Sequence, residues 1–185
     1  MADLSGPPDV EDALGPAAGG GDAGPPGAEV DSALFRQVLG HFATGVAVVT
    51  TTDGHQPAGL AVNSFTSVSL QPPLVAFCAA HESSTWSHIQ AAKSFCVNIL
   101  SEDQEHLSRV FAARDAHKFR GVGWRPAPSG APILSGVLAW IDCSLAAVHP
   151  AGDHSIVVGQ VRELDVAREG RPLVFYRGGY GRFEP

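Results

Sequence analysis

Short apolar blocks rich in valine, other β-branched residues and phenylalanine recur along the chain, and turn-forming residues separate most of them. This pattern is typical of strands that follow one another in hairpins. The Asp53-Gly54 pair after the first block is a strong signal for a hairpin turn. We therefore expect about seven strands, at residues 46–52, 58–65, 72–80, 95–100, 137–149, 154–164 and 172–183.

Three stretches carry helical signals instead, at residues 31–45, 83–92 and 101–112. In the first, Asp31 or Ser32 can cap the helix and Gly45 is expected to end it. An apolar stripe runs along this helix: Leu34, Phe35, Val38, Leu39 and Phe42. The third begins with Ser101 and has Gln104 three positions later, which predicts a capping box. A Gly/Pro-rich crossing at 121–132 follows it.

The predicted strands are too continuous in sequence for alternating βαβ units. An antiparallel sheet that closes, or nearly closes, into a barrel fits their order better. The fold class is therefore mostly β, with two or three short helices.

One predicted strand has an unusual pattern. Between Val62 and Leu70, short hydrogen-bonding side chains fall on both faces, whereas a half-buried strand should alternate cleanly. These side chains are Asn63, Ser64, Thr66, Ser67 and Ser69. Either they bind a ligand, or they cap turns and satisfy one another at the rim of a barrel.

Acidic residues gather at the beginning of the chain, which has a formal net charge of −7 over 185 residues. Residues 1–30 contain six acids, no Lys or Arg, seven Gly and five Pro. They lack aromatic residues and apolar periodicity, so we expect a disordered acidic tail and one domain at 31–185. Without the tail, 12 basic residues stand against 13 acidic ones. A domain so nearly neutral gives no reason to expect nucleic acid or an anionic membrane as a partner.

The chain has no run of roughly 18 apolar residues and no positively charged, apolar start. Its three cysteines are far apart and lie in apolar runs: Cys78, Cys96 and Cys143. They are expected to be buried thiols in a reducing compartment, which places the protein in the cytoplasm.

The common catalytic motifs are absent. The sequence has no G-x-G-x-x-G after a strand, no P-loop, no H-E-x-x-H, no C-x-x-C and no G-x-S-x-G. Asp142, Cys143, His149 and His154 surround one predicted hairpin, but only a guessed register would make them metal ligands, so we expect no metal. The chemistry is then expected to come from a bound organic cofactor.

A flavin suits the polar strand, because its flat ring presents carbonyl oxygens, an N–H and basic nitrogens along one edge. Hydroxyl groups suit the ribityl chain and phosphate. The run of Ser83, Ser84 and Thr85 opens a predicted helix, where free N–H groups and the helix dipole favour an anion.

The chain also resembles a known family through a specific combination of segments. These are "FRQVLGHFATGVAVVTT", "GLAVNSFTSVSLQPPLVAFC", "FCVNIL", "HKFRGVGW", "GDHSIVVGQV" and "PLVFYRGGYG". The combination covers about Leu34 to Tyr180 and resembles the flavin reductase family, which has a split-barrel FMN-binding fold. The resemblance implies an antiparallel, Greek-key-like split β-barrel. It also implies an NAD(P)H:flavin oxidoreductase that supplies reduced FMN or FAD to a partner monooxygenase and works as a homodimer.

The resemblance also implies site residues. His154 of "GDH" is similar to the histidine that faces the nicotinamide, which makes it the candidate catalytic residue. The candidate flavin-binding residues are Asn63, Ser64, Phe65, Thr66, Ser67, Ser69, Ser83, Ser84, Thr85, Lys118, Phe119, Tyr176, Arg177 and Tyr180. Ala61 departs from the pattern, because many relatives have threonine there. This departure leaves the flavin affinity and the choice of FMN or FAD open.

Hydride transfer from nicotinamide to flavin needs two rings held face to face and no strong acid or base, which agrees with the absence of catalytic motifs. Two other functions stay open. One is a flavoprotein of the same fold that keeps its flavin to carry electrons or to reduce an organic substrate, and the other is a non-catalytic flavin-binding barrel. The sequence does not distinguish NADH from NADPH.

Overall fold

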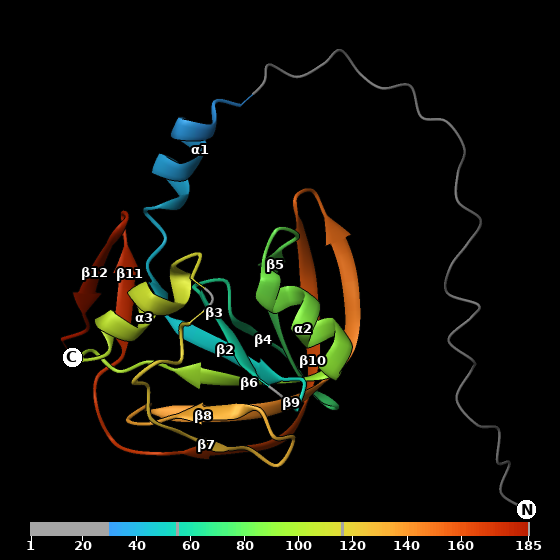
Figure 1. Cartoon of the computed structure of the whole chain (residues 1–185). Coiled ribbons are helices and arrows are strands. Elements are labelled where there is room, and N and C mark those ends of the chain that lie inside the picture. The colour runs from blue at the N-terminus through green and yellow to red at the C-terminus, as the bar shows by residue number, and fades with distance from the viewer. Residues whose placement is uncertain (1–29, 55, 116, 185) are drawn as a thin grey trace, which may run out of the picture.

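The computed structural model describes residues 30–54, 56–115 and 117–184, so the predicted tail lies outside the described residues except for Val30 (Figure 1). The helices are α1 (Ser32–Leu39), α2 (Ser84–Ala92) and α3 (Glu105–Ala112). The strands are β1 (Thr44–Gly45), β2 (Ala47–Thr52), β3 (Pro57–Val62), β4 (Thr66–Leu70), β5 (Pro73–Ala80), β6 (Ser94–Ile99), β7 (Trp124–Pro126), β8 (Pro132–Leu134), β9 (Ala139–Ala151), β10 (His154–Val166), β11 (Leu173–Tyr176) and β12 (Gly179–Arg182).

Seven antiparallel strands form the main sheet, in the order β3-β2-β6-β9-β10-β5-β4. Its two edge strands, β3 and β4, are consecutive in the chain and only residues 63–65 join them. The sheet must therefore curl until its edges meet, which makes it a barrel. This confirms the mostly β, antiparallel barrel that the sequence predicts.

Two smaller sheets lie beside the barrel. Strands β1, β11 and β12 form one, and β7 pairs with β8 in the other. In Figure 1, β11 and β12 lie beside α3, β7 and β8 lie at the bottom of the view, and α1 projects away from the body.

The structure corrects three of the predicted boundaries. The first helix ends at Leu39 instead of residue 45, because the Gly40 carbonyl accepts a hydrogen bond from Arg177 N at 2.9 Å as the β11–β12 turn packs there. The strand predicted at 58–65 ends at Val62, and the Ser64 hydroxyl accepts a hydrogen bond from Cys78 N at 2.9 Å.

The third helix begins at Glu105, because Ser101 bridges to Pro172 and Glu102 N bonds to Arg171 O. Only one half of the predicted capping box is present, with Gln104 Oε1 accepting from Ser101 N at 3.2 Å.

The Gly/Pro-rich crossing also differs from expectation, because it contains the short β7–β8 pair. A buried side chain holds β8 in place: Asn98 Nδ2 donates to Pro132 O at 3.2 Å, and its Oδ1 accepts from Leu134 N at 2.8 Å. Thr50 Oγ1 donates to the same Pro132 carbonyl. These bonds satisfy polar groups that would otherwise be costly inside the core.

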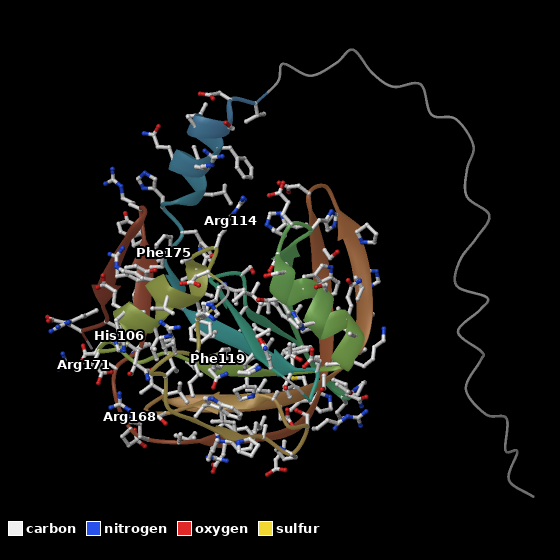
Figure 2. The ribbon with its side chains drawn as sticks, viewed as in Figure 1. His106, Arg114, Phe119, Arg168, Arg171 and Phe175 are labelled. Carbon is white, nitrogen blue, oxygen red and sulfur yellow. The ribbon has the colours of Figure 1, made fainter. Side chains whose placement is uncertain are left out.

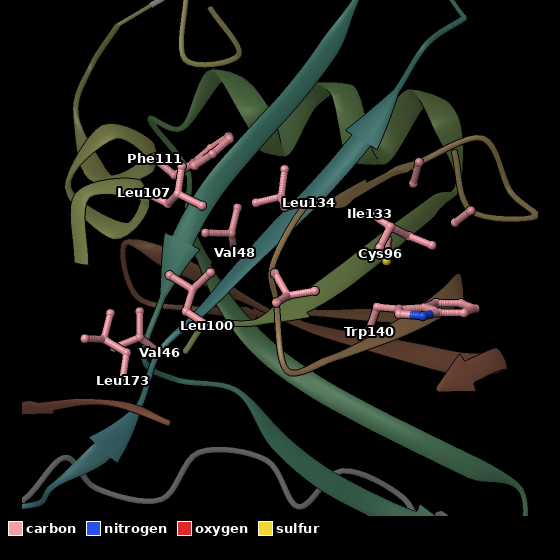
Figure 3. Packing of buried hydrophobic residues seen from close by; sticks show 13 residues of the cluster. Val46, Val48, Cys96, Leu100, Leu107, Phe111, Ile133, Leu134, Trp140 and Leu173 are labelled. Atoms are coloured by element: carbon pink, nitrogen blue, oxygen red, sulfur yellow. The ribbon is translucent and has the colours of Figure 1, made fainter. Parts of the chain in front are cut away.

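The core consists of two clusters of buried side chains. The first lies between the sheet, α3 and the β7–β8 pair, and Figure 3 shows ten of its members labelled. The second lies under α2, where Trp86 and Ile89 pack against the sheet and the rings of Phe77 and Phe95 meet edge to face at 5.3 Å. Together they fix α2 and α3 against the barrel.

The apolar stripe of α1 lies outside both clusters. Leu34, Phe35, Val38 and Leu39 are each more than half exposed, and no residue of α1 is buried. A stripe that is this regular usually packs against another surface. Among the described residues, no helix is long and apolar enough to cross a membrane.

Candidate functional site

A groove runs along β3 between α2 and α3. It consists of three cavities, of about 180, 500 and 210 Å³, that share lining residues. Ala61 and Ala112 line both the first and the second cavity, whereas Ser84 and Lys118 line both the second and the third. A ligand in this groove would therefore touch elements from distant parts of the chain.

Gly59 of β3 lines the third cavity of the groove. Its carbonyl oxygen accepts hydrogen bonds from Thr85 Oγ1 at 2.9 Å and from Lys118 Nζ at 3.1 Å. A Cβ atom at residue 59 would lie 2.7 Å from the Phe111 ring, so only glycine lets that ring pack on the strand.

One end of the groove, formed by the second and third cavities together, favours an anion. Ser83 is the N-cap of α2, but its side chain makes no capping hydrogen bond, which leaves the hydroxyl available to a ligand. Ser83 and Ser84 both line the 500 Å³ cavity. The helix N-terminus adds free N–H groups and the positive end of the dipole.

Lys118 supplies a cation at the same end. Its Nζ also donates to Phe111 O at 2.9 Å, so two backbone carbonyls hold the ammonium group in the groove. Burial lowers the pKa of Lys118, and the negative charge of Asp115 opposes this effect. An ammonium group that is half buried and held by carbonyls is well placed to meet a phosphate.

The other end is more apolar. Phe175, Val46 and Asn63 line the 180 Å³ cavity together with Tyr180, whose Oη lies 2.8 Å from Ser108 Oγ. This end offers ring faces with a few hydroxyl and amide groups, which suits a flat heteroaromatic ligand.

Half of the predicted flavin-binding residues lie along this groove: Asn63, Ser83, Ser84, Thr85, Lys118, Phe119 and Tyr180. The structure assigns two of them structural contacts as well. The Thr85 hydroxyl is buried and donates to Gly59 O, and the Phe119 ring packs edge to face on Phe111 at 5.0 Å.

The polar strand lies elsewhere. Thr66, Ser67 and Ser69 belong to β4, at the edge of the main sheet, and none of them lines the three cavities. The Ser64 hydroxyl is bound to Cys78 N, and Phe65 packs against the second core cluster. Thr66 Oγ1 donates to Ser67 O at 3.2 Å, and the binding of a ligand by this polar strand stays a prediction.

Three further candidates also lie outside the three cavities. Tyr176 packs its ring against His41 at 6.2 Å, and Arg177 occupies the β11–β12 turn with φ +50°. His154 begins β10 at a hairpin tip, opposite Ala80, which lines the large cavity. Its Nδ1 lies 2.7 Å from Asp153 Oδ1, and this hydrogen bond lowers the pKa of Asp153.

Sequence reasoning missed several residues of the groove. The glycine inside β3, Gly59, carried a usable signal, because a glycine in a strand often marks a close approach. Ser108, Phe175, Glu82 and Arg114 carried none. They looked like ordinary helix, strand and loop residues until the fold placed them along one groove.

Glu82 and Arg114 form an ion pair at the rim of the large cavity. Glu82 precedes α2 and Arg114 follows α3, and their Oε2 and Nη2 atoms lie 2.9 Å apart. Figure 2 shows Arg114 between the α3 side and the β5–α2 side of the molecule. Both residues line the large cavity although both side chains are mostly exposed, so they form its rim.

Comparison with known proteins shows the family of this chain. Residues 39–184 match the family model of the flavin reductase like domain. The chain is 52% identical over 155 residues to a flavin reductase from Pseudomonas putida, covering 83% of this chain and 91% of that protein. It is 47% identical over 165 residues to the reductase subunit HsaB of a flavin-dependent monooxygenase from Rhodococcus jostii (strain RHA1), covering 89% of this chain and 85% of that one.

A solved structure is similar as well. The crystal structure of nitrilotriacetate monooxygenase component B from Mycobacterium thermoresistibile superposes with a TM-score of 0.81 and 48% identity, over 84% of this chain and 88% of that chain. The chain belongs to the flavin reductase family. The family and the enzyme class expected from the sequence, an NAD(P)H:flavin oxidoreductase, are thereby confirmed.

Proposed function

We propose that this protein uses NADH or NADPH to reduce diffusible FMN or FAD and supplies the reduced flavin to a separate flavin-dependent monooxygenase. The observation that carries the proposal is the two-ended groove along β3 in a chain of the flavin reductase family. Ser83, Ser84 and Lys118 lie at its anion-favouring end, and Phe175 lies at its apolar end. A flavin has the same two ends, a phosphate and a flat ring.

When bound, the flavin supplies the redox chemistry by accepting a hydride from the nicotinamide. The side chains of the groove bind and orient. Ser83, Ser84 and Lys118 would hold the phosphate end, whereas Asn63 and Tyr180 would contact the ring. His154, which pairs with Ala80 of the large cavity, would bind the nicotinamide donor.

FMN and FAD can both enter the groove. Beyond Phe119 the groove continues into a fourth cavity of about 260 Å³, which shares Gln56 and Pro57 with the third. This extra space gives the second nucleotide of FAD somewhere to lie. A competition experiment, with FMN and FAD displacing each other, ranks the two.

The exposed stripe of α1 supports a homodimer. Its four apolar side chains, followed by Phe42 at 76% exposure, would be covered by a second copy of the chain. Covering apolar surface of this kind is the usual driving force for association.

An assay of the purified protein tests the proposed function. Protein, NADH or NADPH and an excess of free FMN are mixed without oxygen, and absorbance of the reduced nicotinamide is followed. Oxidation of many equivalents per protein supports a flavin reductase. Oxidation of a single equivalent would point to a flavoprotein that keeps its flavin, and no oxidation to a non-catalytic barrel.

A further inference from the structure

We infer that Arg114 binds the phosphate of the incoming flavin and that Glu82 competes with this phosphate for the same guanidinium group. The inference rests on the proposed function, because it concerns the ligand of the same groove. It predicts that Arg114 raises the affinity for the flavin and that Glu82, at the same rim of the large cavity, lowers it.

The geometry gives Arg114 a single role. Its side chain is 91% exposed, and Glu82 Oε2 is its only partner among the contacts of the described residues. An ion pair this exposed contributes little to stability, so the fold does not need it. A guanidinium group that lines the largest cavity of the groove without supporting the fold is available to a ligand.

Glu82 is placed to oppose a phosphate. It comes immediately before Ser83, the N-cap of α2, and lines the same cavity as the two serines. Its carboxylate therefore stands where the helix N-terminus would attract an anion, and it also neutralises Arg114 across the rim. A phosphate that enters is repelled by this carboxylate and competes with it for the N–H donors of the Arg114 guanidinium group.

This competition suits a reductase that must release its product, the reduced flavin, to a separate enzyme. If Arg114 were unopposed, the phosphate would be held more tightly and reduced flavin would leave more slowly. Glu82 offers Arg114 an alternative partner at the moment of release. The Glu82–Arg114 ion pair therefore limits the affinity of the protein for the flavin.

Binding of FMN and of riboflavin, which lacks the phosphate, tests the inference. The readout is the ratio of the riboflavin to the FMN dissociation constant, from quenching of flavin fluorescence at low ionic strength. We expect Arg114→Gln to lower this ratio at least threefold and Glu82→Gln to raise it about threefold. In the double variant, Glu82→Gln should raise the ratio by less than it does when Arg114 is present, because part of its effect acts through Arg114.

Matched variants control for net charge. Arg171→Gln and Glu169→Gln make the same charge changes at exposed positions that line none of the groove cavities; Figure 2 shows Arg171 on a different side of the molecule from Arg114. We expect both to leave the ratio unchanged.

Two results overturn the inference while leaving the proposed function intact. One is a wild-type ratio in Arg114→Gln. The other is an equal gain from Glu82→Gln with and without Arg114, which would show simple charge repulsion. Failure of the proposed function looks different, because the wild-type protein would then neither bind riboflavin or FMN nor oxidise reduced nicotinamide.

Discussion

Lys118 Nζ donates a hydrogen bond to the carbonyl oxygen of Gly59 at 3.1 Å, which joins the loop after α3 to the central strand of the groove. The two residues are 59 positions apart in the chain. This bond fixes an ammonium group directly over the β3 backbone, beside the N-terminus of α2. It thereby connects the loop after α3 to β3, next to the N-terminus of α2, in one site.

Replacing Lys118 tests this contact. We expect Lys118→Met to lower the free energy of unfolding by about 1–2 kcal/mol at neutral pH, because two backbone carbonyls lose a charged donor. It should also weaken FMN binding more than riboflavin binding. Urea unfolding and fluorescence titration measure the two effects, and equal losses for FMN and riboflavin would contradict a phosphate role.

The difference in folding stability between the wild type and Lys118→Met should depend on pH. Burial lowers the pKa of Lys118 below 10.5, so just below pH 10.5 the unfolded chain holds a proton that the folded protein has lost. Wild-type stability should therefore rise with pH in that window relative to Lys118→Met. A difference in stability that stays constant from pH 8 to 10.5 would contradict the lowered pKa.

Gly59 sets the shape of the groove floor. In Gly59→Ala the new methyl group would lie 2.7 and 2.8 Å from two ring atoms of Phe111, so the ring must move into the groove or the strand must shift. We expect a loss of about 1–3 kcal/mol in unfolding free energy, with weaker flavin binding. Gly181→Ala is the matched control, since a Cβ there meets no atom within 4 Å. Equal behaviour of the two variants would mean that the floor tolerates a side chain.

The α1 stripe tests the homodimer. We expect the paired substitution Phe35→Glu and Leu39→Glu to convert a dimer into a monomer, because both side chains are more than half exposed on the isolated chain. Sedimentation velocity measures the change. The folded chain should be unaffected, since no residue of α1 is buried. A wild-type monomer, or a dimer that survives both charges, would exclude this surface.

His154 is expected to act on the nicotinamide donor. His154→Ala should raise the apparent KM for NADH or NADPH several-fold and leave the flavin dissociation constant close to wild type, because His154 pairs with Ala80 of the large cavity but lines none of the three cavities itself. Steady-state kinetics and flavin titration separate the two. Equal loss of donor and flavin binding would indicate a structural role beside Asp153 instead.

Much of the fold could be predicted from the sequence, because each strand carried its own local signal. The valine-rich run of β2, the Asp53-Gly54 turn and the long β9–β10 hairpin all follow from composition over a few residues. Boundaries set by distant contacts could not be predicted in this way. α1 ends where Arg177 meets Gly40, and α3 starts late because Ser101 bridges to Pro172.

The residues of the site also fall into two groups, those that a local pattern predicts and those that only distant contacts bring together. The serines that open α2 were predictable, since a hydroxyl run before a helix signals an N-terminus wherever it occurs. The hydroxyl-rich stretch from Thr66 to Ser69 forms a strand at the edge of the sheet, and its part in flavin binding stays a prediction. Glu82 and Arg114 are 32 residues apart and needed the fold to bring them together.

The most direct test of the account is flavin turnover by the purified protein. Oxidation of NADH or NADPH is measured with FMN at a large molar excess over the protein, first in air and then without oxygen. We predict that without oxygen the nicotinamide consumed equals the FMN added, many times the amount of protein. Consumption that stops at one equivalent of protein, or never begins, would contradict it.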